Sequence, residues 1–299
     1  MLTMETVAIF KQYLEYLFTG QRGLAREWIF DAHDRGFGAH RLLAQIIWPA
    51  MEQVDKLYRE DRISRVTEHL ATRINRMIAD QLQRVLNHKP KDGRRLVVLC
   101  GNSQVSELGA QIASDLFEAE GWSVWFVGSD VPNDEVLQFL GQVTPDLLFV
   151  FSSLPPEVPQ IRQLISLIRE VGICEEMQIM LCGGIYNRAK DLAEEIKADL
   201  RVDTIRQALC LVEENPSRVA RPDDEPLEPG RRRKRKRKAH LARVDELRHR
   251  LGLAADRPDE PVGAVSERIR QAVAQSVLDI SPNELGELDE LDKSDELSH

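Results

Sequence analysis

The polar loop at residues 100–109 is the part of the sequence best placed to do chemistry. Its sequence, CGNSQVSELG, directly follows the apolar run LVVLC and has the outline of a cofactor-binding loop. It lacks the glycines of a dinucleotide-binding loop and the lysine of a phosphate-binding P-loop. No nucleophile with a general base beside it stands out in the chain, so the sequence gives no direct evidence of catalysis.

The four cysteines form no recognisable metal or redox motif. They stand at positions 100, 174, 182 and 210, without CxxC or zinc-ligand spacing. Three of them lie in apolar surroundings, where a free cysteine behaves as a small hydrophobic residue. We therefore expect reduced core cysteines and no metal-ligating residues.

Composition and charge are those of a water-soluble protein. The chain has 299 residues, of which 42% are hydrophobic and 30% charged, and its net charge of -9 argues against indiscriminate nucleic-acid binding. Glu5, Lys11 and Glu15 interrupt the N-terminal apolar residues, so no signal peptide is expected there. No later run is long enough to span a bilayer. We expect a cytoplasmic protein that makes no membrane contact.

The N-terminal third has a helical hydrophobic pattern. From residue 3 to residue 86, apolar residues recur at intervals of three and four, in four stretches joined by short connections. This pattern predicts a four-helix bundle over residues 1–88. Pro49 should bend or restart the third helix.

Beyond a polar linker at residues 87–95, the pattern changes to short apolar runs separated by amphipathic stretches, which predicts a second domain over residues 94–215. This alternation indicates a flavodoxin-like, doubly wound α/β fold with a parallel five-stranded sheet. The expected strands are 96–100, 123–127, 146–152, 178–182 and a weak one near 198–202. The expected helices are 105–120, 132–142, 158–172, 187–197 and 203–214. Cys100, Ser152 and Gly183 should lie at the carboxyl ends of the strands, where such folds bind ligands.

Residues 216–299 differ in composition from the rest of the chain. They include eight consecutive cations, Arg231 to Lys238, and an acidic C-terminal end. We expect a disordered charged tail with two short helices, near 240–252 and 264–279. The basic run is either a solvated linker partly neutralised by the acidic end, or a weak, salt-sensitive contact for nucleic acid.

Three short motifs follow the expected strands of the α/β segment: QVSELG after the first, SSL after the third and CGGI after the fourth. Together they resemble the cobalamin (vitamin B12)-binding domain family of corrinoid methyltransferases and cobalamin-dependent light-sensing repressors. In that family an acidic residue, a spacer, His, two spacers and Gly follow the first strand. Ser-x-Leu follows the third strand, and Gly-Gly follows the fourth. The corresponding residues here are Gln104, Ser106, Gly109, Ser152, Leu154, Gly183 and Gly184.

The helical segment resembles the family's cap domain. The cap signature is Trp, nine residues, then Glu-His; here Tyr58 replaces the Trp, and Glu68 and His69 are retained. The resemblance covers residues 4–213. It implies that the nucleotide tail of cobalamin enters a slot between the sheet and its helices, and that the corrin ring lies between the α/β domain and the bundle.

The resemblance also implies a role for each matched residue. Gly183 and Gly184 would let the backbone approach the tail, Ser152 would hydrogen-bond within the slot, and Gly109 would ease tight packing between strand and helix. Tyr58 would preserve an aromatic cover over the upper side of the corrin ring, with the Glu-His pair nearby.

Two departures from the family pattern bear on cobalt ligation. The family's His coordinates cobalt from below, and its acidic partner orients the imidazole. Ser106 carries a hydroxyl that is a poor cobalt ligand, and Gln104 supplies no negative charge. Arg59 stands where light-sensing members carry an upper histidine ligand. The domain either binds a corrinoid without the lower histidine or has lost cobalamin and keeps the fold as an interaction module.

The function we expect from the sequence is a non-enzymatic sensor or regulator that responds to a corrinoid. It would transmit that state to a regulatory protein partner through the cap or the tail, and self-association is left open. Two alternatives remain: a ligand-free interaction scaffold, and a corrinoid methyl carrier that works with a separate methyltransferase.

Overall fold

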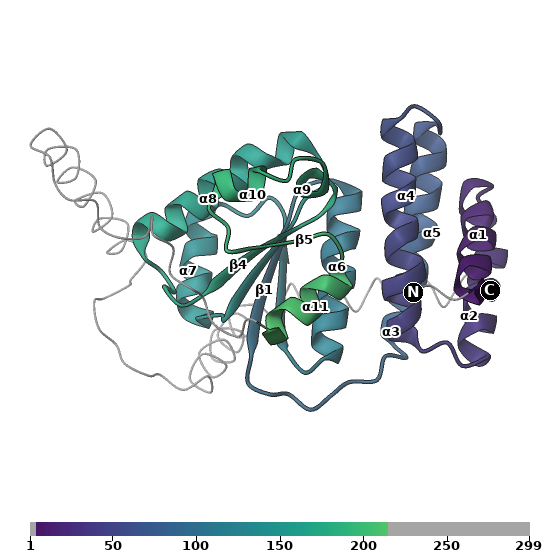
Figure 1. Ribbon diagram of the computed structural model, residues 1–299, viewed down its shortest axis with the longest axis horizontal. Coiled ribbons are helices and arrows are strands. Elements are labelled where there is room, and N and C mark those ends of the chain that lie inside the picture. Colours follow the sequence, from purple (N-terminus) through teal and green to yellow (C-terminus); the bar gives the residue numbers. More distant parts are fainter. Residues whose placement is uncertain (1–3, 215–299) are drawn as a thin grey trace, which may run out of the picture. The chain divides into compact units, whose positions relative to one another are not determined.

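The computed structural model describes residues 4–214, which lie within one compact unit. Its N-terminal part is helical, as predicted, and Figure 1 shows the helices in order. The helices are α1 (Met4–Phe18), α2 (Arg22–Asp34), α3 (Ala39–Leu42), α4 (Trp48–Arg59) and α5 (Arg65–Gln83). A π-helical segment, η1 (Leu43–Ile47), joins α3 to α4. The third predicted helix is therefore one continuous helical run with an irregular centre.

Pro49 explains that irregularity. It is the second residue of α4, where it supplies no backbone N–H to the preceding turn. The helical ladder ahead of it widens from i→i+4 to i→i+5 bonding over η1. Where a bend or restart was predicted, the structure has a change from π-helical to α-helical bonding within an unbroken helical run.

A buried polar pair ties the helices together. The Tyr13 hydroxyl on α1 donates to Asn75 Oδ1 on α5 at 2.7 Å, and Asn75 Nδ2 donates to the backbone oxygen of Ile47 at 3.1 Å. Because a buried amide without partners would be costly, these bonds fix how α1 and α5 lie against the π-helical segment.

The C-terminal part of the described chain is the predicted parallel α/β fold. Its sheet has the strand order β2-β1-β3-β4-β5, and all neighbouring strands run parallel. The strands are β1 (Arg95–Cys100), β2 (Ser123–Gly128), β3 (Leu147–Phe151), β4 (Gln178–Cys182) and β5 (Leu200–Val202). β3 and β4 are buried along their whole length, as central strands covered on both faces should be. The weak fifth strand is confirmed.

Helices cover both faces of this sheet. α6 and α11 lie on one face and α7 and α8 on the other (Figure 1). The helices are α6 (Gln104–Ala119), α7 (Asn133–Val143), α8 (Val158–Val171), α9 (Gly184–Arg188), α10 (Leu192–Ile196) and α11 (Ile205–Glu214), with a 3₁₀ turn, η2 (Pro155–Glu157), before α8.

The single helix predicted over 187–197 is wrong, because the structure has two short helices there. α9 begins earlier, at Gly184, since Gly183 adopts a φ of 118° that reverses the chain directly after β4. α9 ends where Ala189 leaves the helical region, with φ -118° and ψ 80°. α10 then starts after Asp191.

The helical part packs directly on the α/β part. Trp48 of α4 meets Phe151 of β3 edge-on, with ring centroids 5.3 Å apart, and both side chains are buried. Edge-to-face aromatic pairs of this kind add stability beyond the apolar area they bury. The helical core and the α6 face of the sheet therefore form one hydrophobic cluster.

Several other predictions can be compared with residues 4–214. All four cysteines are free; Cys100 and Cys182 are buried and Cys210 is exposed. Within the described range, no group of His, Cys, Asp and Glu side chains is arranged to hold a metal ion. None of the helices in this range combines the length and apolar character that crossing a bilayer would require. The predicted tail, with Arg231 to Lys238 and its two short helices, lies outside the described residues.

Candidate functional site

A cavity of about 370 Å³ lies at the carboxyl ends of the strands, lined by both parts of the chain. Cavities of roughly 300 to 1,000 Å³ are typical of small-molecule sites. Half of the predicted site residues line it. These are Tyr58, Glu68, His69, Gln104 and Leu154. Asp55, Arg65, Asn102, Ser103 and Val105, which the sequence did not single out, complete the lining.

The start of α5 positions the Glu68–His69 pair. Ser64 caps this helix, since its Oγ accepts a 3.1 Å hydrogen bond from the backbone N–H of Thr67. Glu68 is 7% exposed, and its Oε1 accepts a bond from Thr72 Oγ1 at 3.1 Å. His69 Nε2 lies 3.5 Å from Glu68 Oε2 and is more exposed. The carboxylate is therefore held inside the cavity wall, and the imidazole lies at its outer side.

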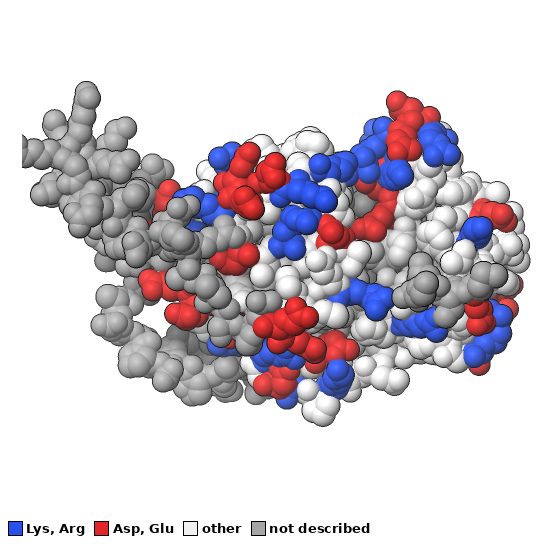
Figure 2. Space-filling view, in the orientation of Figure 1, with Lys and Arg blue, Asp and Glu red and all other residues white. Residues whose placement is uncertain are grey.

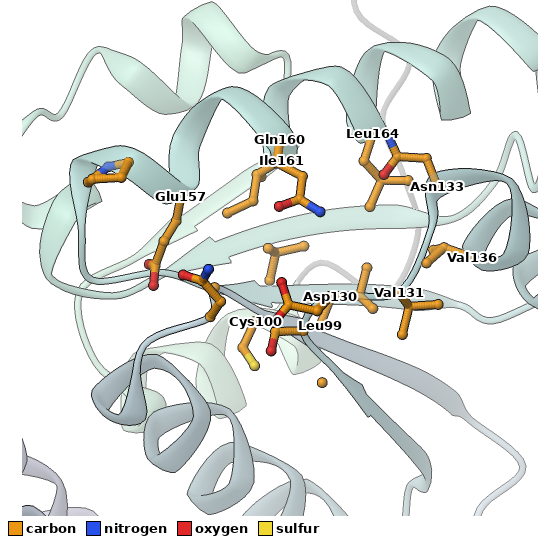
Figure 3. Close-up of a pocket in the computed structure, with 16 residues that line it drawn as sticks. Leu99, Cys100, Asp130, Val131, Asn133, Val136, Glu157, Gln160, Ile161 and Leu164 are labelled. Carbon is orange, nitrogen blue, oxygen red and sulfur yellow. The ribbon is translucent and has the colours of Figure 1, made fainter.

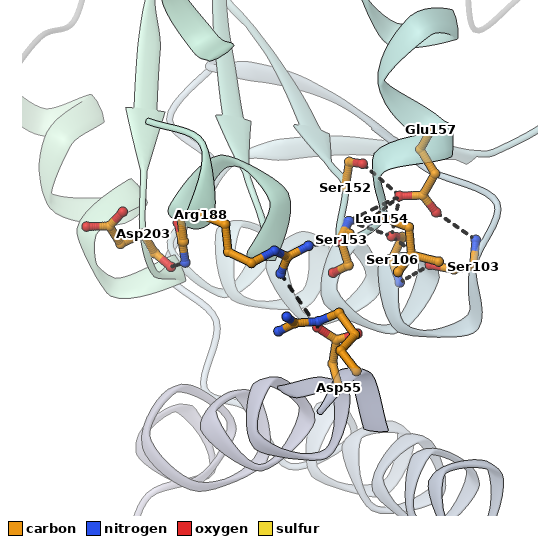
Figure 4. Close-up of polar contacts among 11 residues, drawn as sticks. Asp55, Ser103, Ser106, Ser152, Ser153, Leu154, Glu157, Arg188 and Asp203 are labelled. Atoms are coloured by element: carbon orange, nitrogen blue, oxygen red, sulfur yellow. Dashed lines mark hydrogen bonds and ion pairs between the residues drawn. The ribbon is translucent and has the colours of Figure 1, made fainter. Parts of the chain in front are cut away.

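A hydrogen-bonded cluster links the start of α6 to the segment that follows β3 (Figure 4). It is formed by Ser103, Ser106, Ser152 and Glu157 and is here called the serine–glutamate cluster. Ser103 caps α6 by accepting the Ser106 backbone N–H at 3.1 Å, and its hydroxyl donates to Ser106 Oγ at 2.8 Å. Ser106 Oγ donates to Glu157 Oε2 at 3.0 Å. Ser152 Oγ donates to the same oxygen at 2.7 Å. Ser106 and Ser152 are thus joined through one carboxylate.

Glu157 is the centre of this cluster, although the sequence did not predict it. Its Oε2 also accepts the backbone N–H groups of Ser153 and Leu154, each at 3.1 Å, and its Oε1 accepts that of Ser103 at 3.0 Å. The side chain is 6% exposed. A buried carboxylate is costly unless it is hydrogen-bonded, and these neutral donors supply that stabilisation. The only signal in the sequence was an acidic residue shortly after the Ser-x-Leu motif.

The motif glycines are packed against the chain's own atoms. A Cβ on Gly109 would lie 2.5 Å from the ring of Phe151. One on Gly183 would lie 2.1 Å from the backbone oxygen of Ser152, and one on Gly184 would lie 2.8 Å from Arg188 Nη1. With a larger residue at these positions, the Phe151 ring, the Ser152 backbone or the Arg188 side chain would have to move. That these glycines also make room for a nucleotide tail stays a prediction.

Arg188, Asp55 and Arg59 connect the α/β part to α4 (Figure 4). Arg59 Nε donates to Asp55 Oδ2 at 2.9 Å, and Arg188 Nη1 lies 3.9 Å from the same oxygen. Arg188 Nη2 donates to the backbone oxygen of Ser153 at 2.6 Å. Burial lowers the pKa of Arg188, the positive charge of Arg59 lowers it further, and Asp55 acts in the opposite direction.

A smaller cavity of about 70 Å³ lies on the other side of the sheet edge, between β1, the loop after β2 and α8 (Figure 3). Cys100, Asp130, Glu157 and Gln160 are among its lining residues. Burial, then the charges of Glu107 and Glu157, raise the pKa of Cys100 to about 12. The thiol stays protonated at neutral pH, so it is neither a nucleophile nor a soft metal ligand there. This agrees with the prediction of a core cysteine.

The helical part of the chain is similar to a known protein family. Residues 9–83 match the protein family described as B12 binding domain. This match covers about a quarter of the chain, all of it in the helical part.

The curated relatives that match this chain are corrinoid proteins. Dimethylamine corrinoid protein 1 of Methanosarcina acetivorans is 26% identical over 110 residues, which are 37% of this chain and 51% of the relative. Dimethylamine corrinoid protein 3 of Methanosarcina mazei is 24% identical over 110 residues, 37% of this chain and 65% of the relative. The chain therefore spans between half and two-thirds of the length of these two relatives.

A solved structure supports the same fold. The monomethylamine corrinoid protein of Methanosarcina barkeri is similar with a TM-score of 0.61 at 16% identity, covering 69% of this chain and 98% of that chain. At this identity the likeness shows the fold alone. The predicted fold, a helical domain followed by a flavodoxin-like α/β domain, is therefore confirmed.

The serine–glutamate cluster, which meets the main cavity at Ser103, fits a corrinoid that takes no ligand from position 106. Ser106 and Glu157 present only oxygen atoms, already committed to one another and to backbone N–H groups. Such a cluster offers cobalt no nitrogen ligand. Tyr58, Gln104 and Leu154 supply an aromatic ring, an amide and an apolar side chain around the cavity. This mixture suits a large ligand with an apolar body and amide-bearing edges.

Proposed function

We propose that this protein binds a corrinoid at the 370 Å³ cavity, which would receive part of the ligand, and serves as a methyl-carrying corrinoid protein for a separate methyltransferase. The names of its relatives, all dimethylamine corrinoid proteins, support this reading more than the sensor or regulator expected from the sequence. A regulatory partner, and nucleic-acid contact through Arg231 to Lys238, stay predictions.

The observation that carries the proposal is the convergence of the predicted cap and α/β residues on one cavity. Tyr58 and Glu68 reach it from the helical part, and Gln104 and Leu154 from the α/β part. When bound, the corrinoid would supply a cobalt centre able to hold a methyl group. Tyr58 would shield one side of the ligand from water, Gln104 would hydrogen-bond an amide of the corrinoid edge, and Glu68 would orient His69.

The first test is retention of a corrinoid by the purified full-length chain. We expect incubation with hydroxo-, methyl- or adenosylcobalamin, followed by desalting, to leave a chromophore on the protein. Leu154→Trp should obstruct the cavity and weaken retention, whereas Val85→Trp, at an exposed position after α5, should not. Circular dichroism of both variants checks their folding. If wild type keeps none of the three cobalamins, the proposal is wrong.

The second test concerns methyl carriage. The loaded protein, reduced with titanium(III) citrate and treated with radiolabelled methyl iodide, should keep the label with the protein through gel filtration. Addition of a corrinoid:thiol methyltransferase and its thiol should then release it. A loaded protein that takes up no label, or never gives it up, would be a corrinoid binder without the carrier role.

A ligand-free interaction scaffold remains a second candidate, favoured by one feature. Phe151 fills the space beside Gly109 and is itself covered by Trp48, so the chain packs this region without any ligand. The two candidates predict opposite results in the retention experiment.

A further inference from the structure

Arg188 lies beside the Gly183–Gly184 turn, at which the family resemblance places the nucleotide tail. It is the last residue of α9, one turn after Gly184. Its guanidinium folds back over that glycine, so that a Cβ on Gly184 would stand 2.8 Å from Nη1. The side chain is 33% exposed, so it is held in place yet accessible from solvent.

Positive charges outnumber negative charges in the ion-pair group that contains Arg188. Asp55 Oδ2 is shared by two guanidinium groups, with Arg59 Nε at 2.9 Å and Arg188 Nη1 at 3.9 Å. The Arg59 side chain is 30% exposed, whereas that of Asp55 is 8% exposed. These three groups therefore carry one surplus positive charge, presented on the accessible side. Partial burial and Arg59 both disfavour the charged form of Arg188, so an added anion would relieve both.

The lining of the neighbouring cavity does not cancel this surplus. Glu68 is buried and engaged with Thr72 and His69, and Arg65 adds a further guanidinium to the same wall. Figure 2 shows Lys and Arg side chains interspersed with Asp and Glu side chains along the upper edge of this view of the surface. Asp55 and Glu68 are buried, whereas Arg59 and Arg188 are partly exposed, so an approaching anion meets the guanidinium groups first.

We propose that Arg188, assisted by Arg59, binds the phosphodiester of the nucleotide loop and so makes the protein selective for complete corrinoids. This inference rests on the proposed corrinoid binding. The side-chain amides of cobalamin are neutral, and the phosphodiester is the anionic group of its nucleotide loop. Cobinamide lacks that loop. Arginine is well suited to the task, because its planar guanidinium can pair with two phosphate oxygens at once.

The same contacts have a purely structural explanation that the test must separate. Arg188 could act only as a tie between the α/β part and α4, through Ser153 and Asp55. Loss of such a tie would weaken the binding of every corrinoid alike and lower the melting temperature. Loss of a phosphate contact would weaken only ligands that carry the phosphodiester.

The experiment measures binding of hydroxocobalamin and diaquocobinamide to the full-length protein by absorbance titration. Wild type should bind cobalamin about 10- to 100-fold more tightly than cobinamide, as expected for a partly buried charge-assisted pair. Arg188→Gln should weaken cobalamin binding about 10-fold and change cobinamide binding less than twofold. Arg188→Lys should fall between, since it keeps the charge without the planar fork. Arg162→Gln, at an exposed position on α8, is the matched control and should behave as wild type.

Three outcomes would overturn the inference. Equal affinity of wild type for the two corrinoids, or an equal loss for both in Arg188→Gln, would reduce Arg188 to a structural tie and leave the proposed function standing. Failure of wild type to bind either corrinoid would overturn the proposed function together with this inference.

Discussion

Ser106 Oγ donates its hydrogen bond to Glu157 Oε2 at 3.0 Å, across a separation of 51 residues in the chain. Ser106 is fully buried and Glu157 is 6% exposed. Ser106 stands at the motif position where the cobalamin-binding family carries histidine. Its neutral hydroxyl and several backbone N–H groups therefore satisfy the buried carboxylate of Glu157. The serine is part of an organised polar cluster, and this gives it a structural role independent of any ligand.

Glu157→Gln should destabilise the protein by about 2 kcal/mol. The amide presents an NH₂ group where the carboxylate accepted backbone N–H bonds, so at least one buried donor loses its acceptor. Urea unfolding of the full-length chain measures the change. Glu176→Gln, at an exposed position before β4, should stay within 0.5 kcal/mol, roughly the range of surface substitutions. Equal stability of the two variants would mean that the cluster is not maintained in solution.

Gly109→Ala and Gly23→Ala should have opposite effects on stability. A Cβ at Gly109 would meet the Phe151 ring at 2.5 Å, and overpacking of this kind costs about 1 to 3 kcal/mol. A Cβ at Gly23, within α2, meets nothing within 4 Å, so alanine should stabilise that helix by up to about 1 kcal/mol. Thermal unfolding of both variants checks the pair. A stable Gly109→Ala variant would show that Phe151 can move aside and leave space beside α6.

Asp115→Asn should stabilise the protein at pH 8 and have little effect at pH 4. Burial, then the charges of Asp80 and Glu118, raise the pKa of Asp115 to about 7 from an ordinary value of 3.8, and its Oδ2 is buried without a hydrogen-bond partner among the described residues. An acid whose folded pKa is raised costs stability as pH rises from the unfolded pKa towards the folded one. The cost therefore develops between about pH 4 and pH 7 and should reach about 4 kcal/mol above that window. Urea unfolding of wild type and variant at several pH values measures it; parallel curves would contradict the assignment.

Ser106→His combined with Glu157→Ala should create a lower cobalt ligand if a corrinoid binds as proposed. Removing the carboxylate frees the space that Glu157 now fills and allows an imidazole to enter. Electron paramagnetic resonance of the cobalt(II) form, with ¹⁵N-labelled histidine, should show a protein nitrogen coupled to cobalt in the double variant. Wild type should show no such coupling. A loaded double variant without it would mean that position 106 does not face cobalt.

The secondary structure was largely predictable, because residues that face the core are apolar and recur with the period of the helix or strand. The amphipathic runs of α5 and α8 and the apolar runs of β3 and β4 were located to within a few residues. The exception was the segment after Gly184, where the glycine pair permits a tight reversal and an early short helix. A hydrophobic pattern carries no information about that reversal.

The candidate site was only half predictable, for a different reason. Tyr58, Glu68 and Leu154 could be named because they fall on motif positions, and the structure brings them to one cavity. Glu157 and Arg188 act through partners from other loops and helices, such as Ser103 and Asp55. Such pairings depend on which loops the fold places side by side, and an acidic or basic residue in a loop is otherwise an ordinary surface residue.

The π-helical segment at Leu43–Ile47 sets the phase of everything that follows it on α4. A π turn accommodates about one more residue than an α-helical turn, which rotates the following side chains by about 100° relative to an uninterrupted α-helix. Trp48 and Asp55 owe their orientation towards Phe151 and Arg188 to that offset. Deleting one residue of the segment would leave the helix intact but turn Trp48 and Asp55 away from the α/β part. The packing of the helical part on the α/β part therefore depends on one additional residue in this segment.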